Sequence, residues 1–278
     1  MKCIFCNNDS STSKSVEHIV PESLGNKDII LPKGFVCDVC NNYFARKIEK
    51  PLLESLYFTS MRARNEIYTK KGRAVLENAY FGDCYKNSKI CSDRTKECKG
   101  IYIENDIVVE EILDGRITTL RVPFSFEEVY PNAIMSRFLA KCALEYLVFI
   151  IDTNKQDEFI EDEVLQRQLD PIRKFARYDV GEWGYNQRRI YNESEIWIND
   201  RDEEIQPYET LHEMCIFFRD YKKCDNGQFC ADTYFALVIM GVEYVICISD
   251  PDISGYNDWL KENNYKSPVE REFEHCLN

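Results

Sequence analysis

The chain has 278 residues, 44% of them apolar, which is enough to bury a hydrophobic core as one large domain or two smaller ones. No apolar run reaches the roughly 18 residues that a membrane span needs, which excludes a membrane-spanning protein. Thirteen cysteines with no leading apolar signal segment predict a reducing, cytoplasmic environment rather than a disulfide framework. The net charge of −13 argues against a protein that binds nucleic acid over its whole surface.

Two Cys-x-x-Cys pairs lie near the start of the chain, as Cys3-Ile-Phe-Cys6 and Cys37-Asp-Val-Cys40. Each pair can supply two thiolates to one tetrahedral Zn²⁺, and four soft ligands close the coordination sphere of such an ion. The spacing therefore predicts one structural zinc site made by Cys3, Cys6, Cys37 and Cys40.

Between the two pairs lies the segment Glu17-His18-Ile19-Val20-Pro21-Glu22-Ser23-Leu24-Gly25, and the second pair runs directly into Asn41-Asn42. This order of motifs resembles the HNH endonuclease family, in its four-cysteine subgroup, over about residues 1–55. The resemblance implies a ββα-metal nuclease fold, in which a short hairpin and a following helix hold one divalent ion beside a histidine.

The resemblance also implies roles for individual residues. His18 is expected to be the general base that activates a water molecule, a task that suits the ordinary pKa of histidine. Glu17 and Asn41 correspond to ligands of a catalytic Mg²⁺ or Mn²⁺, with Asn42 replacing Asn41 if the helix register differs. The family's middle asparagine, which braces the hairpin, is missing from residues 31–35, and Asn26 is the nearest candidate.

Basic residues gather toward the N-terminal end. Residues 1–80 hold twelve Lys and Arg against nine Asp and Glu, a net +3, so the remaining 198 residues carry −16. Arg46, Lys47 and Lys50 follow the second cysteine pair and are expected to contact DNA phosphates, although a solvated helix face is the alternative. Because the acidic remainder should repel DNA, we expect activity to depend on a protein partner or an activating signal.

Hydrophobic periodicity and the positions of Gly and Pro predict the other elements. The expected helices are one that opens within residues 35–43 and is interrupted by Pro51, an amphipathic helix over 52–67, a buried helix over 132–151, and a helical stretch over 158–178 broken near Pro171. The expected β-structure is a hairpin over 106–122 that turns at Asp114-Gly115, a strand over 214–220, and a hairpin over 233–249 that turns at Met240-Gly241. Residues 183–210 are expected to form a loop.

These elements predict an α+β protein with two domains. Residues 1–75 would form a zinc-stapled HNH domain with a basic helical extension, and residues 76–278 a larger acidic α+β domain for recognition, regulation or assembly. The implied function is metal-dependent hydrolysis of phosphodiester bonds in DNA, as in bacterial anti-phage defence or restriction. Two alternatives stay open: a zinc-stapled module that binds nucleic acid without cutting it, and a nuclease subunit that is inactive until a partner releases it.

Overall fold

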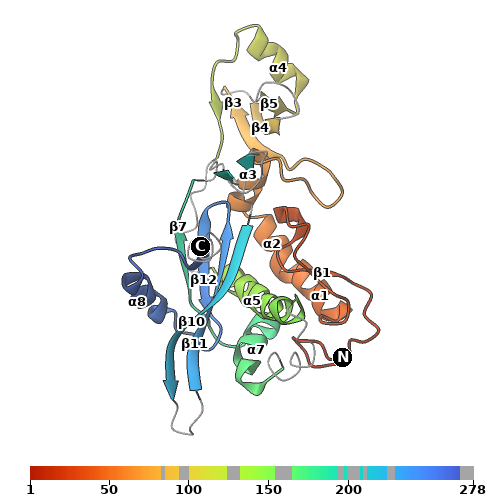
Figure 1. Ribbon diagram of the computed structural model, residues 1–278. Helices are drawn as coiled ribbons and strands as arrows, with labels where there is room; N and C mark the ends of the chain where they lie inside the picture. Colours follow the sequence, from red (N-terminus) through yellow and green to blue (C-terminus); the bar gives the residue numbers. More distant parts are fainter. Residues whose placement is uncertain are drawn as a thin grey trace. The chain divides into compact units, whose positions relative to one another are not determined.

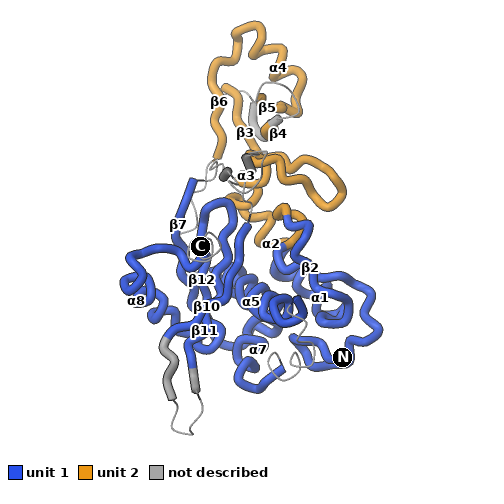
Figure 2. Tube along the Cα trace, viewed as in Figure 1, with its two compact units in different colours: residues 1–20, 26–49, 130–278 blue, residues 21–25, 50–129 orange. Residues whose placement is uncertain are grey.

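The computed structural model describes residues 1–82, 85–93, 100–123, 132–153, 165–192, 197–198, 207–208, 212–223 and 229–269. Its contacts divide the chain into two compact units (Figure 2). Unit 1 comprises Met1–Val20, Asn26–Glu49 and Tyr130–Asn278, and unit 2 comprises Pro21–Gly25 and Lys50–Val129. The mixture of helices and strands confirms the predicted α+β class. These two units do not coincide with the two expected domains, residues 1–75 and 76–278. The expected domains stay a prediction.

The N-terminal elements follow the expected order of two strands and a helix. Strands β1 (Glu17–His18) and β2 (Ile30–Leu31) pair in antiparallel fashion, with Glu17 opposite Leu31 and His18 opposite Ile30. Helix α1 (Asp38–Phe44) then begins after Cys37, whose Sγ accepts a hydrogen bond from the Cys40 N–H and so caps the helix.

The interruption of the helix expected at Pro51 does not lie at that residue. A π-helical turn, η2 (Ala45–Glu49), follows α1 and leads into α2 (Lys50–Leu53), which carries Pro51 in its first turn. Proline lacks an N–H, and its ring clashes with the carbonyl four residues earlier in an α-helix, so a wider turn accommodates it. The predicted helix over 52–67 instead appears as the end of α2 followed by α3 (Leu56–Arg64), which Ser55 caps.

Unit 1 is built around a four-stranded antiparallel sheet in the order β10 (His212–Lys223), β11 (Phe229–Ile239), β12 (Val242–Cys247), β7 (Tyr185–Arg189). Alternate residues of β11 point to opposite faces of the sheet. Helices α5 (Ala133–Thr153) and α8 (Ser254–Glu262) cover these two faces (Figure 1). Phe235 packs against Tyr146 of α5, whereas Tyr234 packs against Tyr256 of α8. The predicted helix over 132–151 and the strand over 214–220 are confirmed.

The hairpin predicted over 233–249 is also confirmed, as β11 and β12 with Ile239 paired to Val242. Met240 and Gly241 form its two-residue turn, and both have positive φ, at 48° and 79°. Such turns match the right-handed twist of the flanking strands. A Cβ on Gly241 would lie 2.1 Å from the Tyr191 carbonyl oxygen, so this position requires glycine.

The helical stretch expected over 158–178 is confirmed in its described part, residues 165–178, but the effect of Pro171 and the loop expected over 183–210 need correction; residues 158–164 lie outside the described residues. Helix α7 (Asp170–Tyr178) follows the short η4 (Arg167–Leu169) and has Pro171 in its first turn, so Pro171 begins the helix rather than breaking it. The expected loop contains β7, which pairs with β12, and a two-stranded pair of β8 (Trp197–Ile198) and β9 (Pro207–Tyr208). The polar β7 lies at the edge of the sheet, where Arg188 donates to the buried Glu243 carboxylate at 2.6 Å.

Unit 2 contains a second antiparallel sheet in the order β5 (Gly100–Ile103), β4 (Tyr85–Asp93), β3 (Glu77–Phe81), β6 (Leu120–Arg121). The hairpin expected over 106–122 is wrong, because residues Asp106–Leu113 form helix α4. Asn105 caps its start by accepting from the Ile107 N–H, and Val108 is buried in the core cluster of this sheet. Asp114-Gly115 ends the helix, with Gly115 at φ 72° in the left-handed conformation common at this position.

Candidate active site

The four predicted zinc ligands converge at one point. The sulfur atoms of Cys3, Cys6, Cys37 and Cys40 all lie within 4.8 Å of one another, and Cys6 and Cys37 are 3.7 Å apart. A tetrahedral zinc site with Zn–S distances of about 2.3 Å has sulfur–sulfur edges of about 3.8 Å. Among the described residues, these form the one group of three or more His, Cys, Asp or Glu side chains that meet in this way. The geometry and the soft donor set both fit a structural Zn²⁺.

Hydrogen bonds already arrange the thiols for deprotonation. The Cys37 N–H donates to Cys3 Sγ at 3.3 Å, and the Cys40 N–H donates to Cys37 Sγ at 3.4 Å. The Cys40 side chain lowers the pKa of Cys3 to about 4, against the effect of burial, and the same contact raises the pKa of Cys40. A lowered pKa favours the thiolate form of Cys3, which is the form that binds a metal ion.

Helix α7 contributes two arginines to the cysteine pairs. Arg173 is buried and donates through Nε to the carbonyl of Ile4, at 2.6 Å, inside the first pair. Arg177 donates through Nε to Cys40 Sγ at 3.3 Å and stacks over the Tyr43 ring at 3.9 Å. Because four thiolates leave a Zn²⁺ site with excess negative charge, a guanidinium in contact with a ligand sulfur is favourable. These contacts come from a segment far along the chain, so the motif itself did not reveal them.

Asn26 holds the connection between β1 and β2. Its side chain is fully buried; its Nδ2 donates to the carbonyls of Val20, at 2.8 Å, and Ile29, at 2.9 Å. Its Oδ1 accepts from the backbone N–H groups of Asp28, at 3.2 Å, and Ile29, at 3.0 Å. An amide with four such bonds fixes the loop in one conformation. Asn26, the nearest candidate for the missing asparagine, therefore braces the hairpin from within its connecting loop.

Glu17 and His18 form strand β1, but their surroundings differ. His18 is partly exposed and has its Nδ1 buried. Glu17 is 6% exposed, and its Oε1 lies 2.7 Å from the Nζ of Lys141 in α5. The carboxylate that the family resemblance assigns to a metal therefore forms an ion pair with a lysine that the motif does not include.

Lys141 is the centre of a buried charge cluster. Its Nζ lies 2.9 Å from Glu49 Oε1 and 3.0 Å from Glu145 Oε2, and the side chains of Lys141 and Glu145 are 0% exposed. Burial lowers the pKa of Lys141, but the carboxylates of Glu145, Glu17 and Glu49 together raise it well above its ordinary value. The ammonium is therefore charged at neutral pH. Lys141 and Glu145 were visible in the sequence as two charges inside an apolar helix, a signal of buried pairing.

The remaining predicted residues lie on the helical path after Cys40. Asn41 donates through Nδ2 to the carbonyl of Val16 at 3.4 Å, which ties α1 to the residue that precedes β1. Asn42 instead donates to the Asp38 carbonyl at 2.8 Å, within its own helix. Asn41 rather than Asn42 is thus next to the strand of Glu17 and His18. Arg46 and Lys47 are exposed, and so is Lys50, which lies 3.8 Å from Glu54.

Comparison with known families agrees with this arrangement. The family model for HNH endonuclease matches residues 3–57, which contain both cysteine pairs, the hairpin and α1. Residues 3–57 form an HNH domain. No curated protein and no solved structure matches the chain. The family assignment therefore applies to the N-terminal segment. None of the described helices is long and apolar enough to cross a membrane.

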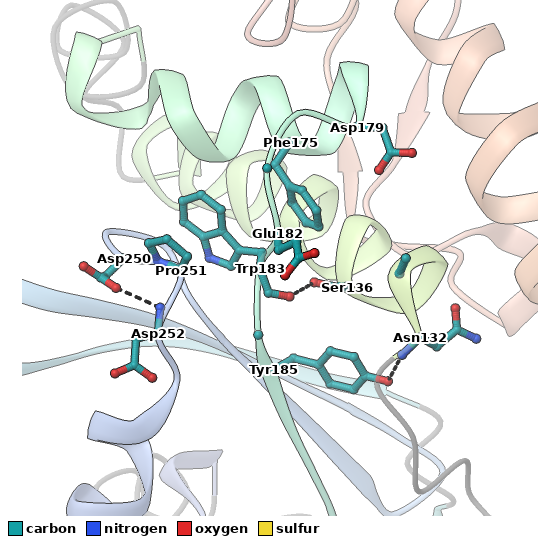
Figure 3. A pocket seen from close by; sticks show the side chains of 13 residues that line it. Asn132, Ser136, Phe175, Asp179, Glu182, Trp183, Tyr185, Asp250, Pro251 and Asp252 are labelled. Atoms are coloured by element: carbon teal, nitrogen blue, oxygen red, sulfur yellow. Dashed lines mark hydrogen bonds between the residues drawn. The ribbon is translucent and has the colours of Figure 1, made fainter.

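A pocket of about 910 Å³ in unit 1 contains none of the predicted site residues (Figure 3). Its walls carry the acidic side chains of Asp179, Glu182, Asp250 and Asp252. The Asp252 N–H donates to Asp250 Oδ1 at 2.7 Å, so part of this acidic lining is occupied by local turn bonds. Four carboxyl groups disfavour a phosphate-bearing ligand.

Proposed function

We propose that this protein is a metal-dependent endonuclease that hydrolyses phosphodiester bonds in DNA, with His18 as the general base. The observation that carries the proposal is the position of His18 on β1, in a hairpin braced by Asn26 and followed by α1, within the segment that also supplies the four-cysteine cluster. The HNH match over residues 3–57 supports a nuclease activity for this arrangement.

His18 has the chemistry for the base. A histidine with an ordinary pKa accepts a proton near neutral pH, where water alone is a poor nucleophile. Because Nδ1 of His18 is shielded from solvent, Nε2 is the nitrogen proposed to take the proton from the attacking water. The partly exposed side chain of His18 extends from a strand in which Ile30 lies directly opposite.

Glu17 and Asn41 are the residues proposed to hold a Mg²⁺ or Mn²⁺ ion. Both offer oxygen donors, which hard cations prefer, and the Asn41 bond to Val16 supports their proximity. When bound, such an ion polarises the scissile phosphate and stabilises the departing 3′ oxygen. Oε1 of Glu17 pairs with Lys141, so a cation held by Glu17 would meet a carboxylate that is already partly neutralised.

Arg46, Lys47 and Lys50 are proposed to contact the DNA backbone. Their side chains are exposed on the helical path that follows the zinc ligands, and phosphate contacts position a duplex without reading its sequence. The acidic remainder of the chain supports a nuclease that stays inactive until a partner or signal reaches the C-terminal region. A cytoplasmic role in anti-phage defence or restriction completes the proposal.

A non-cleaving nucleic-acid-binding module is the second candidate. One observation favours it: Oε1 of Glu17, the proposed metal ligand, is paired with Lys141. In such a module the zinc-stapled fold would bind nucleic acid through Arg46 and Lys47 and perform no hydrolysis.

The experiment that separates the two candidates compares wild type with His18→Ala on plasmid, linear and single-stranded DNA in Mg²⁺ or Mn²⁺. Loss of a general base lowers the cleavage rate by about 10²- to 10⁴-fold, and we expect this loss with zinc content unchanged. His212→Gln, which changes a histidine in β10, is the matched control and should cleave like wild type. Equal rates for wild type and His18→Ala contradict the mechanism. A zinc-loaded wild type that binds DNA and cuts none of the substrates supports the non-cleaving module.

A further inference from the structure

A single ammonium group connects helix α5 to the strand that carries the proposed base. Lys141 is 0% exposed, and its Nζ lies 3.2 Å from the carbonyl oxygen of His18 and 3.3 Å from that of Ile19. The next residue, Cys142, donates through Sγ to the same Ile19 carbonyl at 3.1 Å. Two consecutive residues of α5 therefore hold the backbone where β1 ends.

The backbone pairing of the strand is short. β1 consists of two residues, and the backbone bond that follows it, from Ile19 N–H to the Ile29 carbonyl, is long at 3.4 Å. A two-stranded pairing this short is marginally stable by itself, so contacts with the surrounding structure must help to fix the direction of its side chains. The Lys141 contacts at β1 include both the Glu17 carboxylate and the His18 carbonyl, so they restrain the strand through side chain and backbone together.

We propose that Lys141 is a positioning residue of the nuclease site, whose ammonium fixes β1 so that His18 is presented in one orientation. This inference rests on the proposed role of His18. It extends the functional unit beyond the HNH match, because α5 lies outside residues 3–57. The HNH segment is thereby completed by a helix from the middle of the chain.

A buried ion cluster that serves stability alone is the competing explanation. Removal of one partner from a buried ion pair strongly destabilises a protein wherever the pair lies. The two explanations differ at Glu145, which contacts the Lys141 ammonium from the same helix at 3.0 Å and is fully buried. Glu145 contacts the ammonium, whereas Lys141 itself also lies against the Glu17 carboxylate and the His18 carbonyl.

The test uses the full zinc-loaded chain and compares Lys141→Met with Glu145→Gln. A displacement of about 1 Å at a reacting group lowers a rate by about 10²-fold. We therefore expect Lys141→Met to lower kcat about 100-fold with KM changed less than about threefold, and Glu145→Gln to keep kcat within about threefold of wild type. A Lys141→Met protein that cleaves like wild type overturns the inference, and so does an equal loss in both variants.

Lys141→Met leaves three carboxylates without their cation and can fail to fold. The double variant Lys141→Met/Glu145→Leu removes the fully buried carboxylate together with the ammonium and carries the same test. Zinc content and the far-ultraviolet circular dichroism spectrum identify the variants that are folded. We expect the double variant to show the kcat loss of Lys141→Met.

A measurement that needs no cleavage separates this inference from the proposed function. The chain has three histidines, so selective isotope labelling gives few imidazole signals in an NMR spectrum, and His18→Ala assigns one of them. At fixed pH and without added divalent ion, Lys141→Met should shift or broaden the His18 signal, whereas Glu145→Gln should leave it in place. An unchanged His18 signal overturns the positioning role even if the wild type is a nuclease. A wild type that cuts no DNA refutes the nuclease, while this signal still decides the positioning role.

Discussion

Within the HNH domain, two regions are stabilised differently. One is the two Cys-x-x-Cys pairs, here called the zinc knuckles, and the other is the strand that carries Glu17 and His18. All four zinc ligands come from residues 3–40, and their sulfur atoms meet within 4.8 Å. Strand β1 has two residues and is restrained by Asn26 in its own loop and by Lys141 and Cys142 of α5. A metal site brings its own folding energy to a local motif, whereas a short strand needs neighbours to keep its direction. The first arrangement is local in sequence and the second is not.

The largest expected effect is at the knuckles. Cys37→Ser removes one of four ligands, and structural zinc contributes about 10–16 kcal/mol of apparent binding energy in zinc-finger peptides. We expect zinc content to fall from one ion per chain to none. Amides of residues 1–49 should then exchange rapidly with solvent, while those of β11 and β12 stay protected. Metal analysis and hydrogen exchange measure both, and full retention of zinc contradicts the assignment of the site.

The next effect is at the loop that supports β1. Asn26→Ala deletes four hydrogen bonds and leaves buried backbone groups without partners, so we expect a loss of about 2–4 kcal/mol in the free energy of unfolding. Asn42→Ala is the matched control, because Asn42 is exposed and makes one bond, to the Asp38 carbonyl. Its cost should stay below about 1 kcal/mol. Equal costs in urea unfolding would mean that Asn26 does not brace the hairpin.

A smaller effect is expected where α7 meets the knuckles. Arg177→Ala removes the donor to Cys40 Sγ and should speed the loss of zinc to a chromogenic chelator by about three- to tenfold, because hydrogen bonds to charged acceptors are among the stronger ones. Lys174→Ala, at an exposed position of the same helix, is the control and should release zinc like wild type. If both variants lost zinc at the same rate, α7 would not contribute to the retention of zinc by the knuckles.

The smallest effect concerns pH. Burial lowers the pKa of His212, against the opposing charge of Asp28 in the loop that Asn26 holds. As the pH falls below about 6.5, His212 therefore takes up a proton in the unfolded chain before it does so in the folded one. The contribution of neutral, buried His212 to the free energy of unfolding is present above that pH and is lost below it. His212→Gln should flatten the decline in melting temperature between pH 7 and pH 5. An unchanged pH profile would exclude His212 as its cause.

Some local signals in the sequence were reliable because the physics is local. Ligand spacing brings four cysteines to one ion, an apolar period of 3.6 residues places α5, and Met240-Gly241 turns a hairpin. Other signals were ambiguous because the same residues serve two structures. Asp114-Gly115 ends a helix here although the pair also suits a hairpin, and Pro171 begins α7 although it can break a helix. For α4, the Asn105 cap and the burial of Val108 favour the helix. For α7, the burial of Ile172 and Phe175 favours the helix with Pro171 in its first turn.

The sequence by itself determined the HNH domain, its zinc ligands and the place of His18 within the motif. Only the tertiary structure decided how β1 is held, that Glu17 pairs with Lys141, that Arg173 and Arg177 reach the knuckles, and that the polar β7 is a strand. The physical reason is the distance along the chain. Motif spacing reports on groups that fold together locally, whereas a buried charge or an edge strand is explained only by a partner that the fold brings to it.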